Sequence, residues 1–221
     1  MDPDALASLF EDDDPLRLAG FAAAGAAHEV VVLDRYLDTA PRDGALERAG
    51  MRARLRATAD GVVLALKDEG TREGDIHARL ELEGPATAYV DPTAWLPSPA
   101  RTLLVETTGG APLVVVASLR QRRRVRRLRR GDTEVELSLD ALEALDGGAA
   151  LDGAGGGAGG GAGGGEAVIG RRLELEAELV VGSVADLREL ATALRALPGI
   201  GDAAGSKWRF ARDALEAATE R

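Results

Sequence analysis

The sequence contains no cysteine and only two histidines, His28 and His77. Without cysteine, disulfides, thiolate nucleophiles and Cys-ligated zinc or iron–sulfur sites are excluded. Two histidines without a partner motif also argue against a Ser-His-Asp site or a His-rich metal site. Any metal would therefore be held by carboxylates, whose hard oxygens suit Mg²⁺, Mn²⁺ or Ca²⁺.

Aromatic residues make up 3% of the sequence and hydrophobic residues 45%, so leucine, valine and alanine must form most of the core. The formal net charge is −10, which argues against a general nucleic-acid-binding protein because such proteins need a basic surface. No apolar run reaches the roughly 18 residues of a membrane span, and the acidic N-terminus is unlike a secretory signal. We therefore expect a soluble, cytoplasmic protein with neither a membrane nor a nucleic-acid partner.

The length of 221 residues allows one large domain or two small ones. Residues 1–27 predict a helical N-terminal segment, and residues 213–221 predict the end of a C-terminal helix. Residues 147–165 are mostly glycine and alanine and predict a flexible loop. Because strand-like alternation resumes after this loop, we expect it to join parts of one domain over residues 28–212.

Charged and aliphatic residues alternate over residues 119–140. Every second position over Arg120–Arg126 is basic, Gly131-Asp132 predicts a turn, and the returning segment Glu134–Asp140 alternates acidic and aliphatic residues. A period of two places alternate side chains on opposite faces of a strand. Each of these strands is therefore expected to have a charged face.

Similar alternation recurs elsewhere, and within residues 51–58 arginine occupies every second position. The further elements that we predict are strands over residues 29–37, 51–58, 62–67, 76–83 and 172–181, and a helix over residues 184–197 with Ser183 or a neighbour as its N-cap. In total the pattern indicates about seven strands and a few helices.

Two arrangements fit such strands. In a half-exposed sheet the aliphatic face forms the core, and the charged face meets water with cross-strand ion pairs worth about a few tenths of a kcal/mol each. In a barrel the charged face lines an internal lumen, and the aliphatic face packs outward against helices. The alternation alone does not choose between them.

Several short motifs follow one another in a recognisable order. They are Arg35-Tyr36-Leu37-Asp38-Thr39, Leu46–Arg56, Leu64–Lys67, Arg79–Glu83, Arg120–Arg124, Glu134–Asp140, Glu174–Ser183 and Ser206-Lys207. The ordered set resembles the CYTH domain, or triphosphate tunnel metalloenzyme family, which includes class IV adenylyl cyclases, thiamine triphosphatases and inorganic triphosphatases. The resemblance implies an α+β fold, an antiparallel β-barrel of the triphosphate tunnel type with about seven or eight strands and helices packed outside.

The sequence departs from the family at its start. The family's first strand carries a Glu-x-Glu-x-Lys signature that helps to bind metal and phosphate, and residues 1–27 contain no match to it. Glu174–Glu178 has the acidic spacing but stands where the family has its last strand. We expect either that the chain begins downstream of its native start or that this member has lost the strand. In both cases the metal site is incomplete by the family's standard.

The resemblance also implies which residues form the site. The expected phosphate-binding residues are Arg54, Arg56, Lys67, Arg79, Arg120, Arg122, Arg124 and Lys207. The expected ligands of Mg²⁺ or Mn²⁺ are Asp140, Glu174 and Glu176, and the candidate catalytic carboxylates are Glu81 and Glu83. Solvated strand faces, or carboxylates that only neutralise arginines, are the alternative explanation of the same residues.

The resemblance implies a protein that binds an inorganic or organic triphosphate in a charged lumen with a divalent metal and, if active, hydrolyses it. Because the first strand is missing, a non-catalytic phosphate or polyphosphate sensor is the alternative. A third hypothesis is an interaction protein that uses the basic run Arg120–Arg130 to hold nucleic acid or an acidic partner, although the net charge of −10 counts against it. The sequence leaves open the substrate, the catalytic activity and the oligomeric state, including a homodimer.

Overall fold

The protein is described here from a computed structural model. The described residues are 6, 8–11, 17–40, 43–73, 76–87, 90–146, 166–202 and 205–220. The predicted flexible loop, residues 147–165, lies outside these ranges. In the described part of the chain, no helix is long and apolar enough to cross a membrane.

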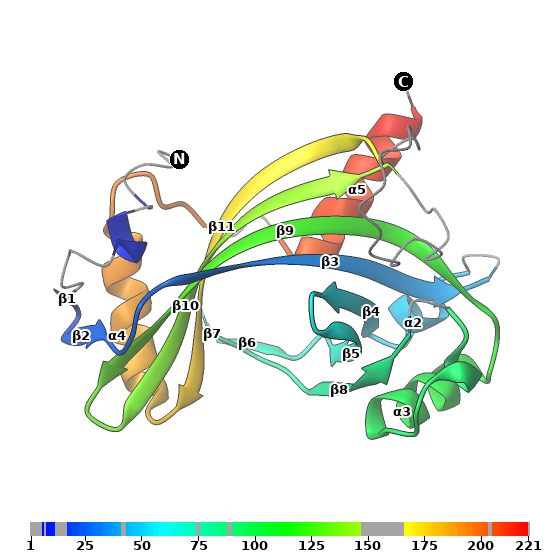
Figure 1. The fold of residues 1–221 in the computed structure, drawn as a ribbon, viewed down its shortest axis with the longest axis horizontal. Coiled ribbons are helices and arrows are strands. Elements are labelled where there is room, and N and C mark those ends of the chain that lie inside the picture. Colours follow the sequence, from blue (N-terminus) through cyan, green and yellow to red (C-terminus); the bar gives the residue numbers. More distant parts are fainter. Residues whose placement is uncertain are drawn as a thin grey trace.

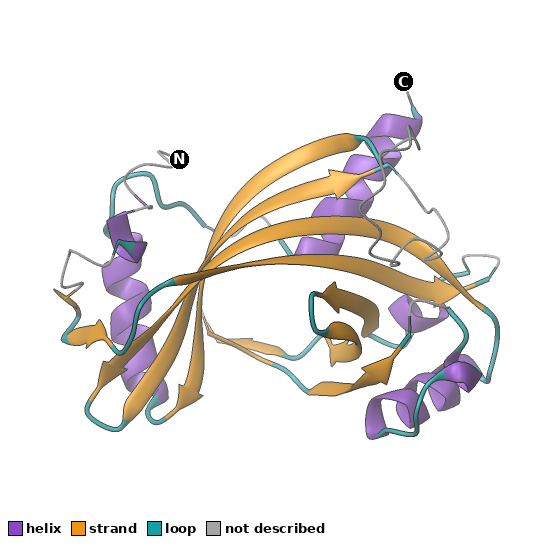
Figure 2. Cartoon of the chain, viewed as in Figure 1, coloured by secondary structure: helices purple, strands orange, loops and turns teal. Residues whose placement is uncertain are grey.

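Nine antiparallel strands form the main sheet (Figures 1 and 2). They are β1 (Arg17–Leu18), β2 (Phe21–Ala23), β3 (His28–Thr39), β4 (Met51–Thr58), β5 (Gly61–Asp68), β8 (Glu81–Ala86), β9 (Leu113–Arg130), β10 (Thr133–Leu145) and β11 (Val168–Val181). A separate pair is formed by β6 (Thr71–Glu73) and β7 (Ile76–Ala78). The helices are η1 (Ser8–Phe10), α2 (Ala45–Arg48), η2 (Pro92–Ala94), α3 (Pro99–Thr108), α4 (Val184–Arg195) and α5 (Lys207–Thr219).

The strand order is β11-β10-β9-β3-β4-β5-β8. The short strand β2 pairs with the C-terminal end of β9, on the same edge of β9 as β3. The long strands β3, β9, β10 and β11 arch over β4, β5 and β8 (Figure 1). The predicted α+β fold with an antiparallel sheet is confirmed. Within the described residues the sheet is not closed into a barrel, because β8 and β11 each pair with one strand only.

The faces of β4 and β5 lie as the barrel hypothesis predicts. Leu55, Leu64 and Leu66 are buried in a cluster with Leu46 of α2 and Leu104 of α3. The alternate side chains of the same strands are the arginines and the lysine of the predicted site. Since apolar burial contributes roughly 25 cal/mol per Å², the leucines fix the strand orientation and turn the charged side chains to the concave face.

Helix α4 covers the far end of the sheet in the same way. Its Leu187, Leu190 and Leu194 pack against the apolar faces of β10 and β11. The hydroxyl of Ser183 accepts a hydrogen bond from the backbone N–H of Ala185, so the predicted N-cap is confirmed.

Helix α5 lies elsewhere than predicted, since it packs on the charged face instead of outside. Its Trp208 and Ala211 join a buried cluster formed by Tyr36, Ala117, Leu119, Leu142 and Ala144. These sheet residues follow the phase of the charged side chains but are apolar at this end of the strands. Gly170 adds room, because a Cβ atom there would come 3.1 Å from Ala214 of the helix.

The N-terminal segment also differs from the helical prediction. In its described part, residues 17–18 and 21–23 are strands β1 and β2, and only Ser8–Phe10 forms a helical turn. The reason is that β9 extends beyond the start of β3 and leaves backbone groups to pair. Ala22 and Ala23 take up this edge, and the buried Phe21 packs against Leu128.

Candidate functional site

The concave face carries a buried carboxylate with two arginines. Asp34 of β3 is fully buried and lies opposite Arg56 of β4. The Arg56 Nε and Nη2 atoms donate to its two oxygens, each at 2.8 Å, and Arg54 Nη1 donates at 3.1 Å. Gln121 of β9 donates to it from the other side. Burial would raise the pKa of the Asp34 carboxyl, but the Arg56 hydrogen bonds and the Arg54 charge outweigh it and lower the pKa.

Lys67 of β5 stands next to this cluster. Its ammonium is 2.5 Å from Glu81 of β8, and Arg54 Nη2 is 3.8 Å from the same carboxylate. Burial, followed by the neighbouring Arg54, lowers the pKa of Lys67 to about 8, although Glu81 opposes the change. Lys67 holds the pKa of Glu81 below its ordinary value despite partial burial. The surroundings therefore favour the ionised form of Glu81, whereas burial favours the neutral form of Lys67.

A second cluster lies where β9 crosses β10. Arg123 pairs with Asp140 in register, and its Nε donates to the Asp140 carboxylate at 2.9 Å. Its Nη2 donates to the Ser138 hydroxyl at 2.9 Å and lies 3.7 Å from Glu176 of β11. Arg123 is thus held on three sides, on the same face as Asp34.

Lys207, the first residue of α5, enters this second cluster. Its ammonium contacts Asp140, lies 2.8 Å from Glu176 and lies 3.9 Å from Glu174. Arg172 also contacts Glu174. Burial raises the pKa of Glu174 even though Lys207 opposes it, whereas Lys207 outweighs the burial of Glu176 and lowers its pKa.

The chemistry of the predicted metal ligands suits Mg²⁺ or Mn²⁺, but their arrangement does not. Asp140, Glu174 and Glu176 all converge on the ammonium of Lys207. Within the described ranges, no group of three carboxylates or histidines is placed to hold a metal ion. A divalent cation at this point would have to displace the lysine side chain.

Three predicted phosphate-binding residues lie on the opposite, convex face. Arg120 is 3.3 Å from Glu143, Arg122 is 3.6 Å from Glu29, and the Arg124 guanidinium lies over the Phe10 ring at 5.8 Å. The expectation that these arginines face the site is therefore corrected. The physical reason is that the run has arginine in both phases of the strand, so alternation could not select the inward one.

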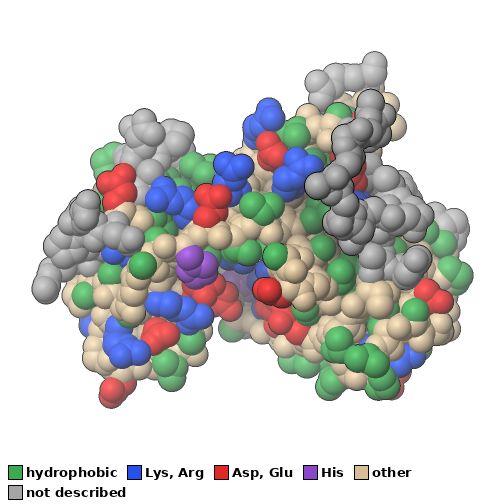
Figure 3. Space-filling view, viewed as in Figure 1, with side chains coloured by type: hydrophobic (Ala, Val, Ile, Leu, Met, Phe, Trp, Pro, Cys, Tyr) green, Lys and Arg blue, Asp and Glu red, His purple; other side chains and the backbone are tan. Residues whose placement is uncertain are grey.

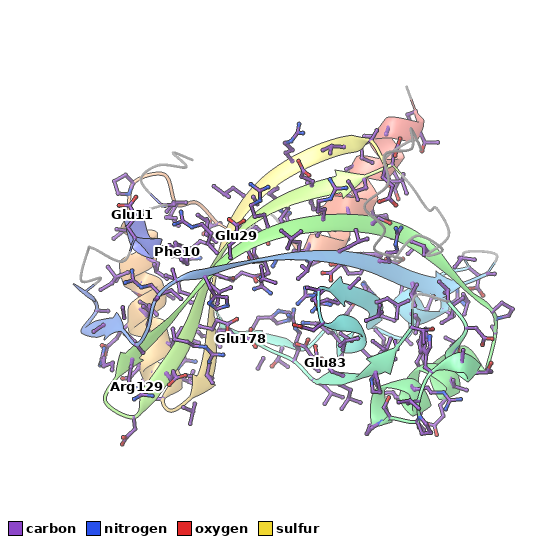
Figure 4. The ribbon with its side chains drawn as sticks, viewed as in Figure 1. Phe10, Glu11, Glu29, Glu83, Arg129 and Glu178 are labelled. Carbon is purple, nitrogen blue, oxygen red and sulfur yellow. The ribbon has the colours of Figure 1, made fainter. Side chains whose placement is uncertain are left out.

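The remaining predicted residues lie at the margin of the site. Arg79 is exposed, and its charge acts on Lys67, Glu81 and Glu176. Glu83 of β8 is also exposed and lines a cavity of about 400 Å³ next to the β4–β5 turn. Figure 4 labels Glu83 and Glu178 on the two edge strands, β8 and β11. In Figure 3 the surface is hollowed between two lobes, with acidic side chains at its edge.

The sequence reasoning missed Arg123, Asp34 and Gln121. Arg123 follows the phase of Asp140, its partner across the hairpin, and that register could have been counted from the Gly131-Asp132 turn. Asp34 is two residues before Tyr36, on the same face. For Gln121 the sequence holds no comparable signal, because only the pairing of β3 with β9 brings it to Asp34.

The CYTH domain profile matches residues 10–208, so the predicted family resemblance is confirmed. A Hippeastrum protein, HpAC1, assigned as an adenylyl cyclase with a dominant triphosphatase activity, has a similar structure with a TM-score of 0.66. It is 19% identical, over 96% of this chain and 91% of that one. A Bacillus halodurans protein assigned as an adenylate cyclase has a TM-score of 0.55 at 10% identity, over 95% and 91%. No curated protein sequence matches the chain.

Proposed function

The chain belongs to the CYTH domain family, and on this premise we propose that it binds an inorganic triphosphate on its concave face and releases the terminal phosphate. One observation carries the proposal. Five cationic side chains from four separate elements, each between 10% and 18% exposed, gather on this face: Arg54, Arg56, Lys67, Arg123 and Lys207. Guanidinium groups match the geometry of phosphate oxygens.

The cationic side chains can supply enough binding energy to hold a triphosphate. A hydrogen bond to a charged group contributes roughly 1.5–3 kcal/mol. Four or five such contacts, reduced by the cost of association, support a dissociation constant on the order of micromolar. In the free protein the carboxylates beside these cations limit their mutual repulsion. A bound triphosphate would take over part of that role.

The aromatic residues near the site favour an inorganic ligand over a nucleotide. The guanidinium groups of Arg52 and Arg212 lie over the Trp208 ring, 4.1 and 4.5 Å from its centroid, and Trp208 is buried. Arg172 lies over the Phe210 ring at 4.6 Å, and Tyr36 is buried. Trp208 and Tyr36 therefore offer no open face on which a base could stack, and an arginine already lies over Phe210.

Hydrolysis needs charge stabilisation and an oriented water. In our proposal the arginines and lysines stabilise the charge that develops on the transferred phosphoryl group. Glu81 is ionised and adjoins both Lys67 and Arg54, so it is the residue that would orient the attacking water. Glu83 is exposed at the margin and is the second candidate. The activity of HpAC1 supports this class of reaction.

The family resemblance implies Mg²⁺ or Mn²⁺, but the carboxylates that would hold the ion do not fit it in their present arrangement. The same observation favours a second candidate function, which is binding of a phosphate polymer without turnover. In that case Lys207 permanently replaces the metal as the cation between the carboxylates.

Two measurements on the purified protein separate these functions. Calorimetric titration with tripolyphosphate in EDTA tests binding, and phosphate release with Mg²⁺ or Mn²⁺ tests turnover. Both functions predict binding that is lost in the Arg54→Ala/Arg56→Ala double variant and kept in Arg122→Ala, which alters the convex face. Binding without release leaves the second function, and no binding under any condition removes both.

A further inference from the structure

Asp34 lies at the centre of the cationic site but has no surface of its own. It is 0% exposed, and its two oxygens accept the hydrogen bonds of Arg54, Arg56 and Gln121. A ligand on the concave face therefore meets the arginines and not the carboxylate. An acidic residue behind an anion site needs an explanation, because it lowers the positive charge that attracts the ligand.

We propose that Asp34 is a positioning residue, which fixes the guanidinium groups of Arg54 and Arg56 in the orientation that binds a triphosphate without touching the ligand itself. The inference rests on the function proposed above and adds a residue that neither the sequence motifs nor the comparisons assign. Asp34 would raise the affinity for the ligand by orienting the two arginines, even though its negative charge repels the ligand.

The backbone arrangement supports this role. Asp34 lies in the middle of β3, with β4 on one side and β9 on the other. Arg56 stands opposite it in register, and Arg54 stands opposite Tyr36, two residues further along the same face. One carboxylate can therefore reach both guanidinium groups. It engages Arg56 through two parallel bonds, which fixes the plane of the group.

The contacts with Asp34 do not use Nη1 of Arg56 or Nη2 of Arg54, and the latter lies 3.8 Å from Glu81 at the other side of the site. The bonds to Asp34 use Nε and Nη2 of Arg56, and Nη1 of Arg54. A guanidinium carries further N–H donors beyond these. If the plane of the group is already fixed, the side chain loses less conformational entropy when the ligand binds. Without Asp34, the two arginines and Lys67 would repel one another.

Gln121 supplies the opposing support. Its amide donates to the Asp34 oxygen that also accepts from Arg54 and from Arg56 Nη2, and it is itself fully buried. The carboxylate is thus held between two strands and cannot follow the arginines if they move. We infer that Gln121 assists the positioning through Asp34 and has no direct part in binding.

The test compares Asp34→Asn, which keeps the side-chain size, with Asp186→Asn. Asp186 is also a partly buried acid, paired with Arg130 at 3.1 Å and with the Thr133 hydroxyl at 2.6 Å, but it lies at the far end of β9. Each protein is titrated with tripolyphosphate by calorimetry at a temperature where it is folded. We expect Asp34→Asn to raise the dissociation constant about tenfold to a hundredfold and Asp186→Asn to leave it unchanged.

A second readout does not depend on binding. In the unsubstituted protein the Arg56 Nε–H group should give a distinct, slowly exchanging NMR signal, assigned by its loss in Arg56→Lys. Asp34→Asn should remove that signal, and Asp186→Asn should keep it. If Asp34→Asn does not fold, Gln121→Leu replaces it, and a rise of the dissociation constant by about threefold to tenfold is expected.

The outcomes are separable. A dissociation constant in Asp34→Asn within about twofold of the unsubstituted value, or an equal rise in Asp186→Asn, overturns the inference. So does an unchanged dissociation constant in Gln121→Leu when that variant is the one used. If the unsubstituted protein does not bind tripolyphosphate, the proposed function fails before any variant is compared, and Asp34 is then only a structural ion partner.

Discussion

Arg122 and Arg123 are neighbours in β9, and their side chains lie on opposite faces of the sheet. The Arg123 side chain is 14% exposed and donates to Asp140 at 2.9 Å, whereas the Arg122 side chain is 68% exposed and lies 3.6 Å from Glu29. A shift of one position along the strand therefore separates an arginine that could bind phosphate from an arginine that is exposed to solvent. This makes the two residues a matched pair for mutagenesis.

We expect Arg123→Gln to raise the dissociation constant of tripolyphosphate about tenfold or more, because one charged hydrogen bond is worth roughly 1.5–3 kcal/mol. Arg122→Gln should leave it unchanged, since the Arg122 side chain is exposed on the convex face and points away from the site. Calorimetric titration of both variants checks the prediction. Equal losses in the two variants would show that net charge, not position, governs binding.

The lowered pKa of Lys67 leads us to expect that triphosphate binding depends on pH. Its pKa is lowered from 10.5 to about 8, so it carries its charge below pH 8 and loses it as the pH rises through that value. We expect the affinity for tripolyphosphate to fall between pH 7 and 9 by about the worth of one charged contact. An arginine side chain at this position would stay charged, so Lys67→Arg should flatten the profile. A flat profile of the unsubstituted protein over this range contradicts the assignment.

The same shift has a consequence for stability. Between about pH 8 and 10.5 the unfolded chain binds more protons at Lys67 than the folded protein does. The contribution of this residue to the free energy of unfolding therefore rises with pH across that window. Urea denaturation at the two ends of the window, compared between the unsubstituted protein and Lys67→Met, measures it. Lys67→Met should gain more free energy of unfolding, relative to the unsubstituted protein, at about pH 8 than at about pH 10.5.

Lys207 and a divalent metal compete for the same carboxylates. We expect Lys207→Met to bind Mn²⁺ more tightly than the unsubstituted protein, because it frees Asp140, Glu174 and Glu176 from their ammonium partner. Electron paramagnetic resonance of free Mn²⁺ follows the titration without any activity assay. Arg195→Met, which removes a cation bound to Asp202 at the surface, is the control. Weaker Mn²⁺ binding in Lys207→Met would mean that the lysine organises the carboxylates.

The burial of the outward-facing leucines indicates how much stability the protein should lose when one of them is replaced by alanine. Leu64 is fully buried under α3, so Leu64→Ala should lower the free energy of unfolding by about 2–5 kcal/mol. Leu80 is 50% exposed, and Leu80→Ala should cost much less. Chemical denaturation of both variants checks this. Similar losses would contradict the assignment of Leu64 to the core beneath the helix.

The sequence was sufficient for the strands that alternate in one phase only. In β4 the odd positions are apolar or small and the even positions 52, 54 and 56 are arginine, so the choice of faces needs only the rule that leucines are buried. In β9 both phases contain arginine, and the side that faces the site depends on the register with Asp34 and Asp140. That register is a long-range property, which local periodicity does not contain.

The sequence by itself determined the family, the antiparallel strands, the shared face of Arg54, Arg56 and Lys67, and the absence of thiol chemistry, because these follow from composition, motif order and a period of two. The tertiary structure decided that Arg123 faces inward, that Asp34 joins two arginines and that Lys207 of α5 stands among three carboxylates. The physical reason is that each of these contacts joins residues far apart in the chain, and their approach is set by strand pairing and by the packing of α5 on the sheet.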